Sequence, residues 1–306
     1  MSTNLLNINL AGLKLDNPTM LASGILGYTG DMLQAVAESG AGAVVTKSVG
    51  VTPRPGYANP TVVQVKGGLI NALGLPNPGI DAYAEEITYA KTIVLAPLVV
   101  SVYGYSAEEY ALAAKKALEA GADAVELNVS CPHVQYTGSE IGQNPKILKD
   151  VVSKVKAEAW KPVFVKLSPN VTDIVEIATV AAKAGADALT VTNTVRAMAI
   201  DAETQRPVLS NIRGGLSGPA IKSIALRCVY EVAEYLKTPI IGCGGITNWQ
   251  DAAEFLIAGA QAVQVGTAIA TQGLGVFEAI NRGLTAYLKR KGYRSVNDIV
   301  GISHRS

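Results

Sequence analysis

The sequence predicts an α/β protein built as a (β/α)8 barrel, with a short N-terminal hairpin and long loops on the C-terminal face of the barrel. Two observations carry this prediction. Apolar segments of strand length alternate with amphipathic helical segments, so that eight strands can be counted, and four helix-to-strand junctions repeat the same Gly-Ala cluster. Near-continuous apolar strands suit a parallel sheet covered on both faces. Repeated strand–helix units of this kind indicate a closed barrel.

The Gly-Ala clusters locate four of the strands. Glycine suits the left-handed residue that closes a helix. The cluster glycines are Gly40, Gly121, Gly185 and Gly259. Seven residues on from each, about one short strand at ~3.3 Å per residue, the chain reaches Lys47, Asn128, Thr192 and Gly266. These four residues are therefore expected at strand C-terminal ends. The remaining strands are expected near 19–24, 97–102, 162–167 and 239–242.

The segments between the strands complete the barrel. Amphipathic helices are expected at 107–120, 145–159, 172–184 and 219–236. Two interruptions, 52–78 and 196–217, are rich in Gly, Pro and Asn, and long strand-to-helix loops lie on the catalytic face of such barrels. Residues 4–17 are expected to form a hairpin that plugs the opposite end. A doubly wound open sheet is the alternative, but eight units without a strand-order break favour closure, in a single domain over 1–306.

Composition excludes several classes of function. The 306 residues carry a net charge of +1, which indicates no nucleic-acid or membrane surface. The longest apolar run, 93–100, is far too short to span a bilayer. Cys131, Cys228 and Cys243 lack metal-ligand spacing and a disulfide framework, which fits a reducing cytosol. The N-terminus has no signal-peptide pattern. We expect a cytoplasmic protein that holds no metal.

Polar residues gather at the expected strand ends. Lys47 and Lys166 follow apolar strands, and two cations at corresponding tips favour anion binding. Side-chain amides and a hydroxyl are expected beside them. These groups can donate hydrogen bonds to, and accept them from, the C=O and N–H groups of a ligand ring. These residues are Asn71, Asn128, Asn193 and Thr194. A single loop asparagine is usually a turn residue, but three asparagines and a threonine in this setting indicate a ligand site.

Glycine-rich turns follow the last two strands, at 242–247 and 264–268, and a third, at 213–219, enters a helix. In this barrel the loops after strands seven and eight frequently bind phosphate through backbone N–H groups. None fits the spaced glycines of a dinucleotide fingerprint. The sequence therefore predicts a mononucleotide-type cofactor and no nicotinamide site in this chain.

One thiol stands where it can take part in chemistry. Pro132 pushes Cys131 toward extended geometry in a loop that leaves the strand ending near Asn128. Such a thiol can titrate, whereas one inside the strand would only pack. Cys228 and Cys243 are expected to be small buried hydrophobic residues.

Four segments resemble the dihydroorotate dehydrogenases: 71–75, 128–132, 165–170 and 214–222, within a similarity from about 10 to 293. Cysteine at position 131 resembles the cytosolic class 1 enzymes. Residues 192–194 and 214–222 look closer to the type 1B catalytic subunit than to the fumarate-dependent type 1A. The resemblance implies a barrel with one noncovalent FMN that oxidises (S)-dihydroorotate to orotate in the synthesis of pyrimidines.

The resemblance also implies roles for individual residues. Cys131 matches the base that removes a proton from the carbon adjacent to a carbonyl, while the neighbouring carbon passes a hydride to the flavin. Substrate contacts are expected at Lys47, Asn71, Ala72, Leu73, Gly74, Leu75, Asn128, Asn193 and Thr194. Flavin contacts are expected at Ser23, Lys47, Ser48, Ser101, Asn128, Lys166, Thr192, Gly218, Gly244, Gly245, Gly266 and Thr267. Ser101 and His133 replace asparagines common in the family, and 59–63 lacks an arginine often seen nearby.

The resemblance also implies a route by which electrons leave the reduced flavin. The type 1B subunit works with a partner that carries FAD and a [2Fe–2S] cluster and passes electrons to NAD, in a heterotetramer built on a dimer of barrels.

The sequence leaves other functions open. They are a type 1A enzyme, another FMN barrel acting on dihydropyrimidines or dihydrouridine, a phosphate-sugar isomerase or aldolase with a Schiff base on Lys166, and a non-catalytic binding barrel.

Overall fold

The computed structural model describes residues 4–129 and 138–305. Within these ranges one sheet of eight parallel strands has the order β3 (Thr19–Leu21), β16 (Ala262–Val265), β15 (Ile240–Cys243), β10 (Ala188–Val191), β9 (Val163–Leu167), β8 (Ala124–Asn128), β7 (Leu98–Val102) and β4 (Val44–Val45). A parallel bridge between Met20 and Ala43 joins the two ends of this order. The predicted (β/α)8 barrel is confirmed.

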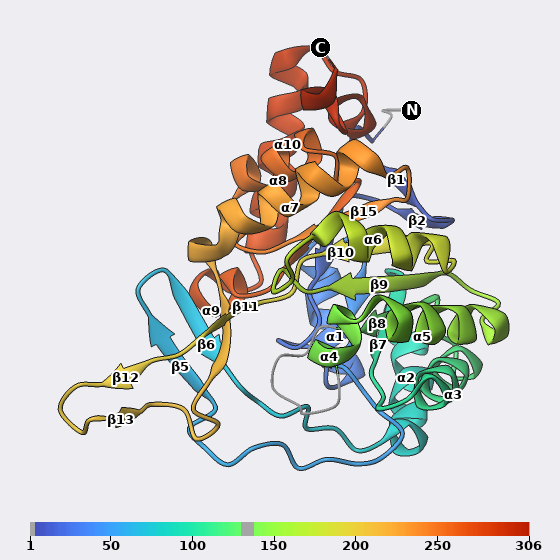
Figure 1. The fold of residues 1–306 in the computed structure, drawn as a ribbon. Helices are drawn as coiled ribbons and strands as arrows, with labels where there is room; N and C mark the ends of the chain where they lie inside the picture. Colours follow the sequence, from blue (N-terminus) through green and yellow to red (C-terminus); the bar gives the residue numbers. More distant parts are fainter. Residues whose placement is uncertain (1–3, 130–137, 306) are drawn as a thin grey trace.

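The strands form where the sequence is apolar because both faces of the sheet are covered. Every residue of β7, β8 and β9 is buried. Helices surround the barrel (Figure 1). They are α1 (Gly30–Glu38), α2 (Ile80–Ile93), α3 (Ala107–Glu119), α4 (Gly138–Gln143), α5 (Pro145–Glu158), α6 (Ile174–Lys183), α7 (Lys222–Tyr235), α8 (Trp249–Ile257), α9 (Ala268–Gln272) and α10 (Val276–Lys291), with 3-10 turns at Pro219–Ile221, Val296–Ile299 and Ile302–His304. No helix of the described ranges has the length and apolar character needed to cross a membrane.

The four helix-to-strand junctions that carry a Gly-Ala cluster have the left-handed glycine expected from the sequence. The four cluster glycines have φ angles between +99° and +119°, a region that glycine enters without a Cβ penalty. An aspartate further stabilises one of these junctions. The Asp123 carboxylate accepts hydrogen bonds from the backbone N–H of Leu98 at 2.8 Å and from Lys91 Nζ at 2.6 Å. Asp187 makes the same two contacts, with Lys156 of α5 and with the backbone N–H of Val163 in β9, each at 2.7 Å. Each aspartate therefore ties a strand to the start of its neighbour.

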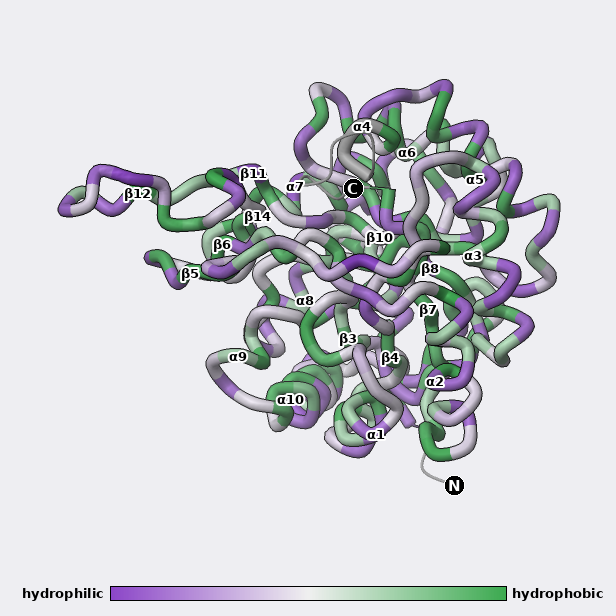
Figure 2. Tube along the Cα trace, turned by 90° about the horizontal axis from the view of Figure 1, so that it is seen from below, coloured by the Kyte–Doolittle hydropathy of each residue, from purple (hydrophilic) through white to green (hydrophobic). Residues whose placement is uncertain are grey.

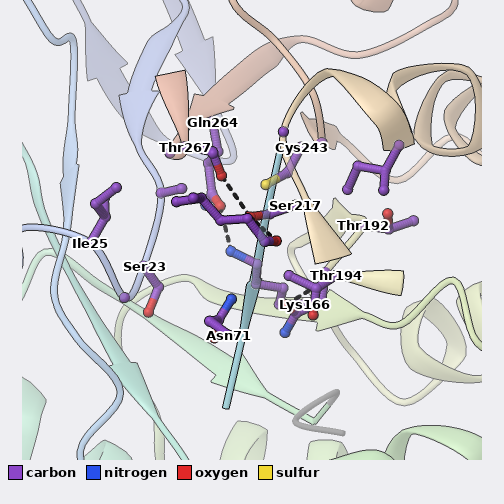
Figure 3. Close-up of a pocket in the computed structure, with 18 of the residues that line it drawn as sticks. Ser23, Ile25, Asn71, Lys166, Thr192, Thr194, Ser217, Cys243, Gln264 and Thr267 are labelled. Carbon is purple, nitrogen blue, oxygen red and sulfur yellow. Dashed lines mark hydrogen bonds between the residues drawn. The ribbon is translucent and has the colours of Figure 1, made fainter. Parts of the chain in front are cut away.

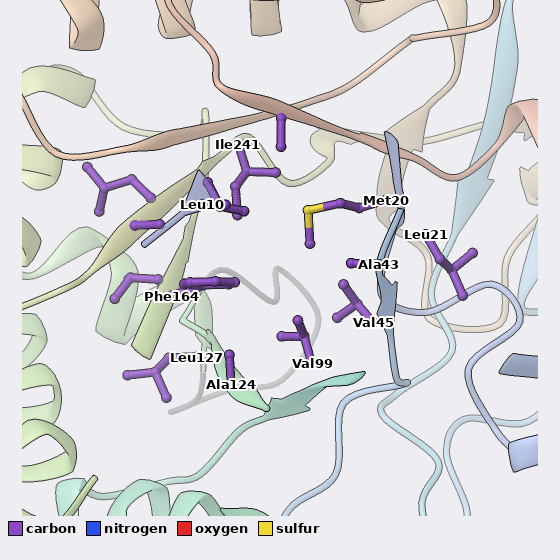
Figure 4. Close-up of a cluster of buried hydrophobic side chains, with 14 of the residues drawn as sticks. Leu10, Met20, Leu21, Ala43, Val45, Val99, Ala124, Leu127, Phe164 and Ile241 are labelled. Atoms are coloured by element: carbon purple, nitrogen blue, oxygen red, sulfur yellow. The ribbon is translucent and has the colours of Figure 1, made fainter. Parts of the chain in front are cut away.

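The N-terminal hairpin is confirmed. Strands β1 (Ile8–Leu10) and β2 (Leu13–Leu15) pair antiparallel. In Figure 1 they lie near both chain termini, at the end of the barrel away from β5 and β6. Leu10 is fully buried in the main core, and Figure 4 shows it beside Met20, Phe164 and Ile241. The hairpin thus fills the barrel from the end opposite the long connections.

The two long connections lie on the C-terminal face of the barrel, as expected, but they also hold strands that the sequence did not predict. They contain β5 (Val62–Val65), β6 (Gly68–Asn71), β11 (Val195–Ala197) and β14 (Gly214–Ser217), which form a four-stranded antiparallel sheet in the order β11-β14-β6-β5. A further hairpin, β12 (Ile200–Asp201) with β13 (Arg206–Pro207), extends beyond it. This side sheet projects from one side of the barrel (Figures 1 and 2). It joins Asn71 to Gly215, a pairing that local sequence patterns do not reveal.

Candidate active site

A cavity opens at the C-terminal ends of the barrel strands. It encloses about 330 Å³, within the range of ~300–1,000 Å³ usual for small-molecule sites. The barrel contributes residues at or just after the ends of its strands, and the side sheet supplies Val62, Leu69, Asn71 and Ser217 as a further wall. Active sites of (β/α)8 enzymes lie at this face of the barrel.

Most residues singled out in the sequence line this cavity (Figure 3). From the expected substrate set these are Lys47, Asn71, Leu73, Gly74, Leu75, Asn128, Asn193 and Thr194. From the expected cofactor set they are Ser23, Ser48, Lys166, Thr192, Gly218, Gly244, Gly245, Gly266 and Thr267, besides Lys47 and Asn128. The structure therefore brings these residues together, while their contacts with ligands stay predictions.

Two expected contact residues lie behind the cavity wall. Ala72 is fully buried in a small separate core with Ile70 and Leu209, under the side sheet. Ser101 is also fully buried, and its hydroxyl lies 2.8 Å from that of Ser48, which does line the cavity. Either residue can act on a ligand through its neighbours rather than by side-chain contact.

The proposed base, Cys131, lies outside the described residues, as do Ser130, Pro132 and His133. The strand that leads to this segment is well defined. Asn128 ends β8 at the cavity, and Tyr110 donates a hydrogen bond to its carbonyl oxygen at 3.0 Å. The last described part of β8 therefore ends on a residue that lines the cavity.

Polar side chains form a connected line along one wall. The Asn128 amide donates to the Ser48 hydroxyl at 2.9 Å, and the Asn193 amide nitrogen lies 3.4 Å from the Asn128 amide oxygen. Ser23 and Ser48 hydroxyls lie 3.4 Å apart. Because these amides and hydroxyls come from four different barrel units, the line depends on closure of the barrel. It offers donors and acceptors suited to a polar ring.

Two cations lie within this polar surface. Lys47 is buried, and its Nζ lies 5.1 Å from the centre of the Tyr28 ring, a cation–π distance. Burial raises the pKa of the Tyr28 phenol. Lys166 is 4% exposed and donates to the Gln264 side-chain oxygen at 2.8 Å. The cavity is therefore suited to anionic ligands.

Sequence reasoning missed the acidic group beneath Lys166. Glu126 is fully buried, and one of its carboxylate oxygens lies 3.7 Å from Lys166 Nζ. Burial, the largest single effect, acts to lower the pKa of Lys166, but the nearby Glu126 and Cys243 together outweigh it and the pKa is raised. A charged residue inside the apolar strand 124–128 and a glutamine inside 262–265 were the available signals. Neither signal identifies its partner without the barrel geometry.

The three glycine turns border the other side of the cavity. Within the described ranges, the backbone N–H groups of Gly244, Gly245, Gly266 and Thr267 have no hydrogen-bond acceptor. Thr267 also donates its hydroxyl to that of Ser217 at 2.8 Å, which links the last barrel strand to the side sheet. Free backbone donors around a cavity suit a phosphate group.

The two remaining cysteines differ from each other. Cys228 is fully buried on α7, as expected. Cys243 is only half-buried and lines the cavity, so its expected role as a core residue is wrong. Burial of the thiol raises the pKa of Cys243, and the Lys166 charge offsets this only in part. Cys243 faces the ligand space because β15 ends there.

The fold and the site together define a (β/α)8-barrel enzyme whose cavity is lined by cations, amides and glycine turns. The chain belongs to the dihydroorotate dehydrogenase family, whose model matches residues 5–288. It is an oxidoreductase of that family.

Relatives and a solved structure agree with this placement. The chain is 52% identical, over 98% of its length and 99% of the relative, to "Dihydroorotate dehydrogenase B (NAD(+)), catalytic subunit" of Pyrococcus abyssi. It is 51% identical, over the same shares of both chains, to the protein of that name from Methanothermobacter thermautotrophicus. A crystal structure of DHODH from Eimeria tenella in complex with ferulenol has a TM-score of 0.88 at 24% identity and covers 100% of this chain and 90% of that one. The last similarity concerns the fold alone.

Proposed function

We propose that this chain is the catalytic subunit of an NAD-linked dihydroorotate dehydrogenase, which oxidises (S)-dihydroorotate to orotate in pyrimidine biosynthesis. The printed names of relatives at about half identity support the activity and the electron acceptor. The observation that carries the proposal is the cavity itself, where Lys47, Asn71 and Asn193 meet Lys166 and the glycine turns. The single domain over 1–306 and a cytoplasmic location belong to the same proposal.

The cavity fits one FMN on three grounds. Backbone donors of Gly244, Gly245 and Gly266 have no acceptor within the described residues and suit its phosphate. The hydroxyl of Thr192 is buried at the cavity and has no hydrogen-bond partner there either. Lys166 supplies positive charge where a reduced flavin gathers negative charge. Bound FMN would supply a two-electron acceptor.

The chain's own residues then do the remaining chemistry. Lys47 would hold the substrate carboxylate, and the amides of Asn71, Asn128 and Asn193 would orient its ring through C=O and N–H groups. Cys131 would take a proton from the carbon adjacent to a carbonyl. An unperturbed thiol has a pKa of about 8.5, so it ionises in part near neutrality and serves as a base without a histidine partner.

The electrons need a route out of this subunit. We propose a separate electron-transfer subunit carrying FAD and a [2Fe–2S] cluster, because the relatives are named catalytic subunits of an NAD(+) enzyme. The expected assembly is a heterotetramer, a dimer of barrels with one electron-transfer subunit docked to each.

The test begins with the absorption spectrum of the purified chain after reconstitution with FMN. We expect flavin absorbance at one equivalent per chain, and its bleaching under anaerobic titration with dihydroorotate as orotate forms. A colourless protein would contradict the FMN site and favour a phosphate-sugar isomerase or aldolase. A yellow protein that is reduced by dihydrouracil but not by dihydroorotate would indicate another FMN barrel.

A further inference from the structure

Glu126 is a buried charge that the proposed function does not use. It lies on β8 two residues before Asn128 and is fully buried next to Lys166 and Gln264, which line the cavity. A buried carboxylate is costly unless it is paired and hydrogen-bonded. Its surroundings therefore indicate what it does.

The two oxygens of this carboxylate have different environments. Oε2 accepts hydrogen bonds from Thr190 Oγ1 at 2.8 Å and from Gln264 Nε2 at 2.6 Å. Oε1 has no hydrogen-bond partner in the described part of the chain and lies 3.7 Å from Lys166 Nζ. One oxygen is thus fixed by neutral donors, and the other faces the cation.

Glu126 also controls Lys166 through Gln264. Because the Gln264 amide nitrogen donates to Glu126, its oxygen is turned toward Lys166, which donates to it at 2.8 Å. Both Lys166 and Gln264 line the cavity (Figure 3). The carboxylate therefore sets the position of two groups that a ligand would contact, without lining the cavity itself.

The titratable groups around Lys166 are few in the described chain. Glu126 faces it from β8 and Cys243 from β15, while the cavity also holds Lys47 beyond β4. A buried lysine without a counter-charge loses its proton readily. Among the described groups Glu126 opposes this loss most strongly, and Cys243 adds to its effect.

We propose that Glu126 is a positioning residue that keeps Lys166 protonated and, through Gln264, aimed into the cavity as the counter-charge of the reduced cofactor. The inference rests on the proposed function because it concerns bound FMN. It assigns Glu126 a part in setting the flavin's reduction potential rather than in contacting substrate.

The first test measures the midpoint potential of bound FMN in wild type and Glu126→Gln. Removing one negative charge while Lys166 keeps its proton stabilises the reduced flavin. At about pH 6 we expect the equilibrium constant for two-electron reduction of FMN to rise on the order of tenfold in Glu126→Gln. This corresponds to a midpoint potential about 30 mV higher than in wild type. Toward about pH 9 Lys166 loses its proton in the variant and the difference shrinks. No difference, or one that is equal at both pH values, overturns the proposal.

Thr190→Val is the matched control. It removes one hydrogen bond to Glu126 Oε2 but leaves the carboxylate charge in place, and Thr190 does not line the cavity. At either pH we expect the equilibrium constant for FMN reduction in this variant to stay within about twofold of the wild-type value. A shift as large as that of Glu126→Gln would assign the effect to packing and overturn the proposal.

A second measurement needs no flavin. Apo protein is labelled with a small amine reagent such as acetic anhydride over a range of pH, and Lys166 modification is mapped by mass spectrometry. We expect Lys166 in Glu126→Gln to react roughly tenfold faster than in wild type near pH 8, with surface lysines unchanged, because the neutral amine is the reactive form. Equal rates would overturn the proposal. Failure of wild type to bind FMN would instead refute the proposed function.

Discussion

Gly245 and Gly266 both border the proposed phosphate site, yet the structure gives them different constraints. Gly245 has a φ of +75°, and a Cβ there would lie 2.8 Å from the backbone N and Cα of Lys222 at the start of α7. Gly266 has no such backbone constraint, and a Cβ there would meet only the Ala22 Cβ, at 3.3 Å. From sequence alone, a bulky residue at Gly245 is the natural test of flavin binding. The structure makes Gly266 the cleaner one.

The expected magnitudes follow from these contacts. Alanine at Gly245 should cost about 1–2 kcal/mol for the left-handed backbone and about 1–3 kcal/mol for overpacking. Alanine at Gly266 should cost less than about 1 kcal/mol in apo stability. If the Gly266 methyl displaces one backbone donor from a phosphate, the loss is that of a charged hydrogen bond, about 1.5–3 kcal/mol. This corresponds to roughly 10- to 150-fold weaker FMN binding.

Two assays separate folding from binding. Urea denaturation of the apo proteins gives the free energies of unfolding, and quenching of FMN fluorescence gives the dissociation constants. We expect Gly266→Ala to retain apo stability and lose FMN affinity, and Gly245→Ala to lose stability. Wild-type FMN affinity in Gly266→Ala, or wild-type apo stability in Gly245→Ala, would refute this reasoning.

Three further predictions concern chemistry, pH and electron transfer. Cys131→Ser should slow flavin reduction by dihydroorotate about 10²–10⁴-fold while orotate still binds, with residual activity rising at higher pH; unchanged stopped-flow rates would exclude Cys131 as the base. Burial opposes ionisation of Asp251, but hydrogen bonds from Lys222 and Thr247 outweigh it and lower its pKa. Asp251 therefore stabilises the folded protein at pH values above its pKa in the unfolded chain, and this contribution is lost as the pH falls through its pKa in the folded protein. Asp251→Asn should consequently lose less free energy of unfolding than wild type when the pH is lowered into the acid range. Equal losses of unfolding free energy in the two proteins would contradict this. The isolated chain should reduce dyes but not NAD in steady-state assays, whereas comparable fumarate reduction would favour type 1A.

Much of the fold follows from short-range patterns. The strand runs such as 97–102 and 162–167 were apparent because both faces of a parallel sheet are buried, which leaves little need for polar alternation. The cluster glycines were apparent because a helix end with positive φ requires them. The side sheet was missed because β6 and β14 are far apart in the sequence, and their pairing is stabilised only after the barrel brings them together.

The sequence by itself determined the barrel, several of its strand ends and most residues of the cavity, since a seven-residue step from a helix-ending glycine reaches the same face in four of the eight units. Only the tertiary structure decided which of these residues lie behind the wall, as Ala72 and Ser101 do, and that Cys243 lines the ligand space. It alone paired Glu126 with Lys166 through Gln264. These three side chains belong to three different strands, and hydrogen bonds across a closed barrel depend on distances that no local pattern encodes.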